Sequence, residues 1–310
     1  MKHLNRNAIS PRIGISALCV PLFLSLPPWA TALATPIRAV SVPPGVQLPF
    51  SPASAPAAPG PSLDPGDGTT CCEGAWLTEP TGMLSSTTGK VVLSSGDIEA
   101  AVDDFRALLG DPNNGTAPGE HATGRREINW DAVPAAVTNV VNFPSRFFNV
   151  KSPRGLVYEP GTRGLEVSDR NFTDINPTYA AEFTPFSGQK IFSPLGNIEV
   201  DVRFFVAGTG VEAGVRGIGI VFLDVDLDGN SGLQVEAKDG SILARIHAPA
   251  RSDARGASFA GIAFRDPVIS RVRIVSGNGI LSPNEIDISQ GGQHDLVVMD
   301  DFLYGEPTAN

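Results

Sequence analysis

Apolar and polar residues alternate most regularly between Asn197 and Val206. Within this stretch apolar side chains occupy every second position, and mostly charged side chains occupy the positions between them. A period of two predicts a β-strand with one face in a core and the other in solvent. The run Val215–Leu223 is apolar almost throughout, which predicts a central strand that is buried on both faces.

Further short apolar segments occur from Arg126 onward, and Gly, Pro, Asn and Asp residues separate them. Asp239-Gly240 lies between two of these segments and predicts a hairpin turn. Many short strands joined by turns are typical of antiparallel sheets. We therefore expect an all-β fold, an antiparallel two-sheet sandwich of the jelly-roll type. The segments are Leu233–Ala237, Ser241–Ile246, Phe259–Phe264, Val268–Val275 and Asp295–Phe302.

One helix is expected, between Ser95 and Gly110. Apolar residues recur at helical spacing within it, with Val102 and Phe105 at the centre of the stripe. Ser95 or Asp97 is suited to cap its first turn, and Gly110 can end it in the left-handed conformation.

The first 34 residues have the pattern of a secretory signal peptide. Basic residues precede the uncharged, mostly apolar stretch Ile13–Leu26, and small residues ending at Ala34 form an A-x-A cleavage signal. A proline-rich stretch follows that cannot bury enough apolar surface to fold. The chain is thus expected to comprise a signal peptide (1–34), a disordered linker (35–70), a loosely attached or edge segment (71–94) and the β-sandwich (95–310).

Net charge and cysteine content limit the partners of the secreted chain. The formal charge of −10 disfavours binding to nucleic acids and to anionic membranes. We expect no membrane span in the mature chain, and we expect it to be secreted, extracellular or periplasmic. After cleavage only the adjacent Cys71 and Cys72 would remain, and these cannot join distant parts of a fold.

Several phrases of the sequence form an ordered set between Phe105 and Pro307. They resemble a family of secreted bacterial β-sandwich proteins that has no assigned activity. The resemblance implies the fold but no catalytic residue. The phrases are Gly124–Asp131 (GRREINWD), Asn149–Gly155 (NVKSPRG), Phe222–Asp226 (FLDVD), Arg271–Asn278 (RVRIVSGN) and Val297–Pro307 (VVMDDFLYGEP).

Alternate carboxylates followed by glycine form the sharpest local motif. Asp224, Asp226, Asp228 and Asn230 are spaced so that one tight loop could place oxygen atoms around Ca²⁺, which is the tentative cofactor. The later positions depart from a helix-flanked calcium loop, since Val235 occupies the place of the bidentate acid. The alternative is a strand end whose acidic side chains point into solvent.

Asp300 and Asp301 lie among apolar residues of the last predicted strand. Consecutive side chains of a strand point to opposite faces, so one of the two is expected to be buried or at a rim. A buried carboxylate needs a partner. We favour a salt bridge over a metal, with a partner among Arg125, Arg126, Arg271 and Arg273.

No motif of a known catalytic class occurs, and we lean against an enzyme. The histidines at 121, 247 and 294 lack metal-ligand spacing, and neither a nucleophile elbow nor a phosphate-binding loop is present. Glycoside cleavage or a lyase reaction would need two facing carboxylates. The acids available for that role are Glu127, Asp131, Glu166 and Glu182.

Aromatic residues are the remaining candidates for ligand contact. Trp130, Tyr158 and Tyr179 could stack on the apolar face of a sugar, although burial in the core is the commoner fate of such side chains. We therefore expect an extracellular binding or surface-interaction protein, stabilised by Ca²⁺ and with a glycan or cell-surface component as its partner. The alternatives are a carbohydrate-active enzyme and a structural protein of the cell envelope or matrix.

Overall fold

The computed structural model describes part of the chain, and all of that part lies within a single unit, residues 37–310. The signal peptide, most of the linker, residues 71–88 and both remaining cysteines lie outside the described residues. The described residues are 40–42, 89–159, 164–251 and 256–310.

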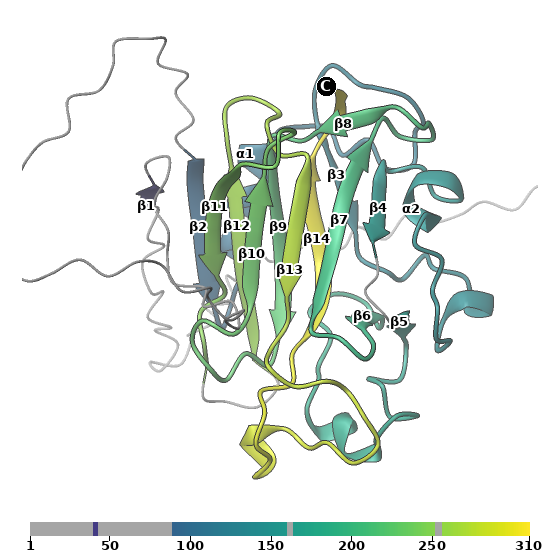
Figure 1. Ribbon diagram of the computed structural model, residues 1–310, viewed down its shortest axis with the longest axis vertical. Coiled ribbons are helices and arrows are strands. Elements are labelled where there is room, and N and C mark those ends of the chain that lie inside the picture. The colour runs from purple at the N-terminus through teal and green to yellow at the C-terminus, as the bar shows by residue number, and fades with distance from the viewer. Residues whose placement is uncertain (1–39, 43–88, 160–163, 252–255) are drawn as a thin grey trace, which may run out of the picture. The chain divides into compact units, whose positions relative to one another are not determined.

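Two antiparallel sheets pack face to face, which confirms the expected all-β sandwich (Figure 1). The first sheet has eight strands in the order β1 (Val40–Val42), β2 (Gly89–Ser95), β12 (Ala257–Ala263), β9 (Gly217–Leu223), β14 (Val298–Gly305), β6 (Ile191–Pro194) and β5 (Leu165–Ser168), with β3 (Arg125–Ile128) also paired to β14. The second has seven in the order β11 (Ile242–His247), β10 (Gly232–Glu236), β13 (Arg271–Val275), β7 (Glu199–Phe205), β8 (Glu212–Gly214) and β15 (Thr308–Ala309), with β4 (Leu156–Glu159) also paired to β7.

The predicted strands occur where the hydrophobic pattern placed them. On β7 the apolar side chains of Val200, Val202 and Phe204 are buried, while Arg203 between them is exposed. All seven residues of β9 are buried, as expected for a central strand. Strands β10 and β11 form the predicted hairpin, although its connection includes Ala237 to Ser241 and is longer than a two-residue turn.

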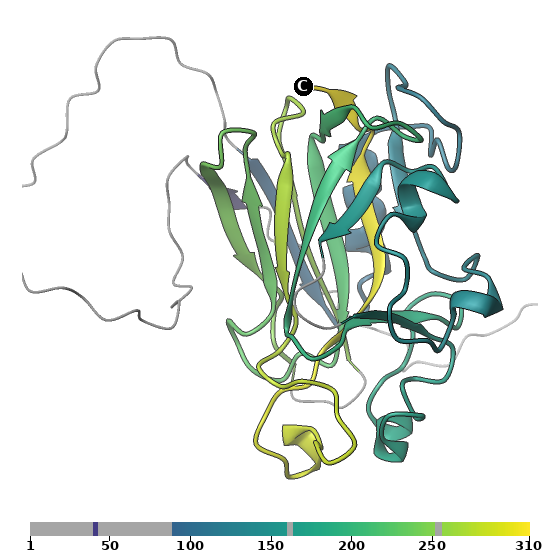
Figure 2. The ribbon, with the colours of Figure 1, turned by 45° about the vertical axis from the view of Figure 1, so that its right-hand side comes forward.

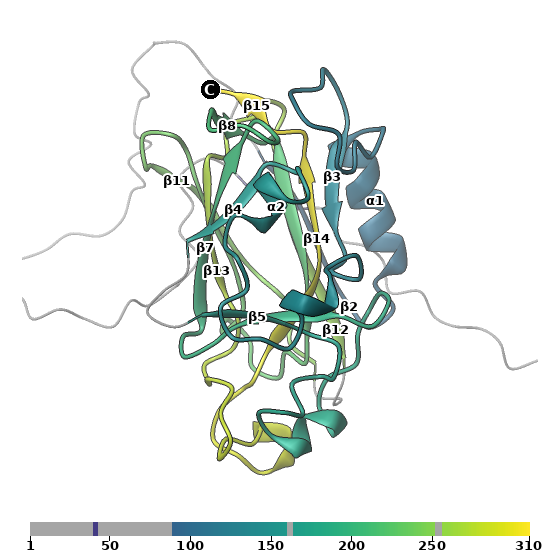
Figure 3. The ribbon, with the colours of Figure 1, turned by 90° about the vertical axis from the view of Figure 1, so that its right-hand side faces the viewer.

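The main core fills the space between the two sheets, and a second core covers the outer face of the eight-stranded sheet. Strand β14 contributes to both, because Met299 and Phe302 face the other sheet while Val298 and Leu303 face outward. The outer core is closed by α1 (Glu99–Leu109), which gives the layer order seven-stranded sheet, eight-stranded sheet and helix (Figure 3). Burial on both faces explains the continuous apolar sequence of β9.

Helix α1 is shorter than expected at its start. Ser95 ends strand β2, the N-cap position is Ile98, and no side chain caps the helix. Gly110 ends the helix with a φ of 96° and a ψ of 167°, so its φ is positive, as predicted, but it lies outside the left-handed helical region. The apolar stripe is confirmed, since Val102 and Phe105 are fully buried.

Two glycines allow α1 to approach the sheet. Gly219 of β9 and Gly261 of β12 are paired neighbours, and the Phe105 ring lies over both. A Cβ atom at Gly261 would lie 2.8 Å from the ring, and one at Gly219 would lie 2.7 Å from it. Side chains at these positions would therefore displace the helix from the sheet.

Short helical segments occur in the connections. These are α2 (Phe147–Val150), η1 (Ala135–Val137), η2 (Pro177–Ala181) and η3 (Ile288–Gln290). The chain between β3 and β4, which carries η1 and α2, runs along one side of the sandwich (Figure 2). Within the described residues, none of the helices combines the length and the apolar character needed to cross a membrane.

The prediction that Asp300 or Asp301 pairs with Arg125, Arg126, Arg271 or Arg273 is wrong. Both carboxylates are buried at a bulge where β14 has one residue more than β9. Asp300 accepts hydrogen bonds from the amides of Phe186 and Ser187 at 2.6 and 3.0 Å, and Asp301 lies 3.8 Å from Arg106 of α1. The four arginines proposed from the sequence pair with other carboxylates, chiefly Asp111, Glu127, Glu306 and Asp201.

We expect Gly261→Ala to destabilise the fold by about 1–3 kcal/mol, because the added methyl group would push against the Phe105 ring in a packed core. Urea unfolding followed by circular dichroism would measure the change. Gly210→Ala is the matched control, since a Cβ there meets no atom within 4 Å, and it should stay within about 0.5 kcal/mol. Equal effects of the two substitutions would contradict this account of helix docking.

Candidate metal centre

The loop that begins at Asp224 directly follows the buried strand β9. Asp224 has a φ of 67°, a left-handed conformation that aspartate tolerates better than most residues. Its amide donates to the carbonyl oxygen of Gly256 at 2.7 Å. This turn directs the chain away from the sheet at the point where the acidic motif begins.

Five carboxylates from three separate segments meet beside this loop. Carboxylate oxygens of Glu182, Asp224 and Asp287 lie within 4.8 Å of one another, and those of Asp226, Asp287 and Asp295 form a second such group. Asp287 belongs to both groups. We call these five residues the acidic cluster.

The segments that carry the cluster are positioned by the outer core. Glu182 follows η2, and Asp287 and Asp295 flank the segment that contains η3. Both segments extend from the end of the sandwich opposite the C-terminus (Figures 1 and 3). Phe183 and Leu296, the neighbours of Glu182 and Asp295, are buried in the outer core, so apolar packing holds the carboxylates in place.

Hydrogen bonds fix the orientation of the carboxylates. Asp295 accepts from the amides of Asp226 and Leu227 at 3.2 and 3.0 Å, which ties the two loops together. Asp287 caps η3 by accepting from the amide of Ser289 at 2.7 Å.

A second bond to Asp287 comes from the amide of Leu296 at 2.6 Å. Glu182 accepts from the hydroxyl of Ser289 at 2.8 Å and from the amide group of Gln290. Glu182, Asp287 and Asp295 are thus preorganised rather than free to turn into solvent.

Four of the five carboxylates in the cluster are buried, so their negative charges lie close together away from solvent. Glu182, Asp224, Asp287 and Asp295 are each at most 1% exposed. The described lysines and arginines form no ion pair with Glu182, Asp287 or Asp295. Unbalanced charge in a site of low polarity is costly unless protons or a cation neutralise it.

The pKa values of the cluster are raised accordingly. Burial, the hydrogen bond to Glu182 and the charges of neighbouring carboxylates raise the pKa of Asp224. Burial and the proximity of Asp287 raise the pKa of Asp226 to about 7. Burial and the charge of Asp287 raise the pKa of Asp295 to about 6, although the amides of Leu227 and Asp226 oppose the rise.

The donor atoms of the cluster fit a hard cation. All are carboxylate oxygens, which Ca²⁺ and Mg²⁺ prefer, and neither group contains sulfur or imidazole. His294 is next to Asp295 in sequence, but its ring contacts Glu285 at 2.7 Å. The side chain of Asp226 is only partly buried, and its Oδ2 atom has no hydrogen-bond donor among the described residues.

Half of the predicted calcium loop contributes to the cluster. Asp224 and Asp226 belong to the cluster. Asp228 is exposed, and it accepts a hydrogen bond from the amide of Ala250 at 3.2 Å. Asn230 lies outside both groups. The alternative interpretation of a solvated strand end therefore describes Asp228 but not Asp224, which is buried.

Three members of the cluster were missed as metal ligands. Glu182 stood out only as a candidate acid for glycoside chemistry, and Asp287 and Asp295 are about 60 residues or more beyond the motif. Asp287 carries a local signal, since an aspartate followed three residues later by Gln290 is typical of the start of a helical turn. That signal predicts a cap and not a ligand.

The three aromatic candidates are core residues, which is the commoner of the two fates considered for them. Trp130, Tyr158 and Tyr179 are at most 1% exposed. Trp130 stacks on Phe192 with 4.4 Å between ring centres, and its indole nitrogen donates to the carbonyl oxygen of Asp300 at 2.8 Å. Burial of these rings is favoured because it removes a large apolar area from water.

Tyr179 has a further structural role near the cluster. Its hydroxyl accepts from the amide of Ser282 at 3.1 Å and lies 3.0 and 3.1 Å from the carbonyl oxygens of Ser282 and Glu285. This side chain therefore joins η2 to the segment that leads into Asp287.

The four acids considered for glycoside cleavage are held in separate interactions. Glu127 pairs with Arg106 and Arg125. Asp131 accepts from the amides of Gln189 and Lys190. Glu182 belongs to the acidic cluster. Glu166 is buried on β5, and burial together with the charge of Asp174 raises its pKa to about 7.

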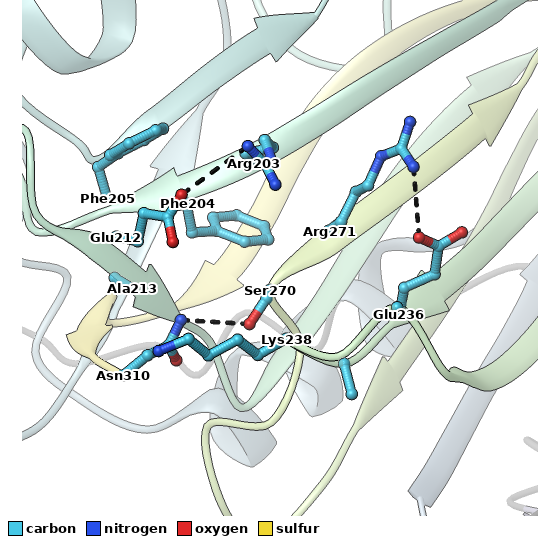
Figure 4. Close-up of a pocket in the computed structure, with 12 residues that line it drawn as sticks. Arg203, Phe204, Phe205, Glu212, Ala213, Glu236, Lys238, Ser270, Arg271 and Asn310 are labelled. Carbon is cyan, nitrogen blue, oxygen red and sulfur yellow. Dashed lines mark hydrogen bonds and ion pairs between the residues drawn. The ribbon is translucent and has the colours of Figure 1, made fainter.

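A separate hollow of about 140 Å³ lies on the outer face of the seven-stranded sheet (Figure 4). Both of its arginines pair with glutamates that also line it. Arg271 lies 3.5 Å from Glu236, and Arg203 lies 3.9 Å from Glu212. The ring of Phe205, half-buried, lines one side of the hollow.

No protein-family model matches this chain, and no curated protein matches it. The resemblance to secreted bacterial proteins therefore stays a prediction.

We expect the free energy of unfolding of the Glu166→Gln protein to depend less on pH than that of the unchanged protein. A carboxyl group with a raised pKa in the folded state binds its proton more tightly there, so its contribution to stability is complete below about pH 4.5 and is lost as pH rises to about 7. Urea unfolding at several pH values would give the slopes. Equal slopes for the two proteins between pH 4.5 and 7 would contradict the raised pKa.

Proposed function

We propose that the protein is a secreted extracellular binding module whose β-sandwich is stabilised by Ca²⁺ at the acidic cluster. The observation that carries the proposal is the convergence of five carboxylates from three segments, of which Glu182, Asp287 and Asp295 are held by hydrogen bonds. A cation bound there would neutralise charge that burial makes costly, and it would fasten the loops to one another. Secretion, inferred from the first 34 residues, is consistent with this cofactor because the extracellular medium contains abundant Ca²⁺.

The chemistry of the ion would be structural. Ca²⁺ takes six to eight oxygen ligands, and either group of three carboxylates would supply some of them while water would supply the rest. Asp287 is suited to a central position, because its oxygens lie near both groups. The hydrogen bonds of Asp287 and Asp295 hold their carboxylates in place before a cation arrives.

We place the contact with an extracellular ligand at the hollow of Figure 4. Arginine, glutamate and asparagine side chains there can bond the hydroxyl groups of a glycan, and Phe205 adds an apolar ring. Arg146 already lies over this ring at 5.5 Å, so the polar side chains would supply most of the contact. Glycan-array binding in the presence of CaCl₂, compared between the unchanged protein and Glu212→Ala, tests this placement, and equal binding by both would reject it.

We expect CaCl₂ to raise the melting temperature of the purified protein relative to EDTA. A ligand that binds only the folded state at a hundred times its Kd contributes about 2.7 kcal/mol, which corresponds to a shift of roughly 5–10 °C for a domain of this size. Differential scanning calorimetry with CaCl₂ and with EDTA measures the shift.

The variant Asp226→Asn tests the site with little structural cost. The Asp226 side chain is only partly buried, and removing its charge relieves repulsion. In EDTA the variant should therefore melt at the same temperature as the unchanged protein or higher, and in CaCl₂ most of the shift should be lost. Asp228→Asn is the matched control from the same loop and should keep the full shift. Loss of the calcium-dependent rise in melting temperature in Asp228→Asn would contradict the proposal. Retention of the full rise in both variants would also contradict it.

A further inference from the structure

A cavity of about 330 Å³ lies at the end of the sandwich opposite the acidic cluster. It is half-open to solvent and is lined by the loop between α1 and β3, the start of β9, the loop after β12 and Thr308 of β15. Figure 3 shows the loop between α1 and β3 rising beside β8 and β15 at this end. The cavity shares no residue with the acidic cluster or with the hollow of Figure 4.

Arg216 lines this cavity without a partner for its charge. Its Nε atom is buried and has no hydrogen-bond acceptor, and its guanidinium forms no ion pair with any described residue. The Arg216 side chain is half-buried, and a buried N–H group that lacks an acceptor costs free energy. Arg126, by contrast, is fully buried and lies 2.6 Å from Glu306.

The acids that line the cavity are already neutralised. Glu306 receives hydrogen bonds from Arg126 at 2.6 Å to each oxygen and from the Asn114 amide group at 2.8 Å. Asp111 forms an ion pair with Arg125. The positive charge of Arg216 is therefore uncompensated within the cavity.

Two further nitrogen-bearing side chains line the same space. Arg265, exposed in the loop after β12, forms no ion pair among the described residues, not even with its neighbour Asp266. His121 has a buried Nε2 atom that lacks a hydrogen-bond partner. Two arginines and one histidine thus surround one cavity in a chain whose formal net charge is −10.

The position of Arg216 is fixed by the strand beside it. Its aliphatic part lies against Gly305 of β14, where a Cβ atom would be 2.6 Å from the Cγ atom of Arg216. The carbonyl oxygen of Arg216 accepts from the amide of Phe264 at 2.6 Å. The backbone and the first part of the side chain are therefore held in place, which reduces the entropy that ordering Arg216 on a ligand would cost.

We propose that this cavity binds a small anion bearing a phosphate, sulfate or carboxylate group, with Arg216 as its main contact. Guanidinium groups match the geometry of these oxyanions and can donate two parallel hydrogen bonds to them. Arg265 contributes a second charge at the rim, and His121 can donate from Nε2. The site is independent of the Ca²⁺ proposal, because it lies at the other end of the sandwich and uses other residues.

Calorimetric titration of the purified protein with inorganic phosphate, sulfate and citrate tests the proposal. EDTA and constant ionic strength keep Ca²⁺ and general salt effects out of the comparison, and the three titrants distinguish the anion classes. We expect saturable binding of at least one anion at one site. Arg216→Met, which keeps the aliphatic part of the side chain, should weaken this binding by about tenfold or more, the order expected for a lost charge-assisted hydrogen bond.

Two further variants keep the test decisive if Arg216→Met folds poorly. Arg265→Met changes an exposed side chain and should weaken binding without altering the melting temperature in the absence of the anion. Arg170→Met removes an exposed arginine outside the cavity and should leave binding unchanged. Equal binding by all the variants, or no saturable binding of any titrant, would overturn the proposal.

Discussion

Burial of both faces of β9 and β14 is the constraint on which the rest of the structure depends. A strand buried on both faces needs a second layer, so the outer face of the eight-stranded sheet must be covered. Helix α1 covers part of it through Phe105, and the segments containing Phe183 and Leu296 cover the rest. These covering segments carry Glu182, Asp287 and Asp295, so apolar packing brings the acids together.

Charge is distributed unevenly between the two ends of the sandwich. At one end carboxylates gather, and burial raises the pKa of Asp226 and Asp295. At the other end Arg126 and Glu306 neutralise each other, while Arg216 lines a cavity without an acid of its own. Both proposed sites rest on the same physical rule, because buried charge without a partner is stabilised by a ligand of the opposite sign.

Local sequence signals found the elements and part of the site. The period of two in β7, the continuous apolar run of β9 and the stripe of α1 each follow from side-chain hydrophobicity, which acts on neighbouring residues. The carboxylates of Asp224 and Asp226 were identified because they lie in one short motif. Asp228 has the same spacing but faces solvent, because the chain turns at Asp224 and only the first two acids reach the covering segments.

The sequence by itself determined the sandwich, its antiparallel strands, the helix and the acidic character of the loop after β9. Only the tertiary structure decided which distant residues meet. Asp287 and Asp295 reach Asp226 because the outer core folds their segments back over the sheet, and Arg106 approaches Asp301 because the Phe105 ring fits over two glycines. Such pairings depend on packing between elements far apart in the chain, which hydrophobic periodicity does not encode.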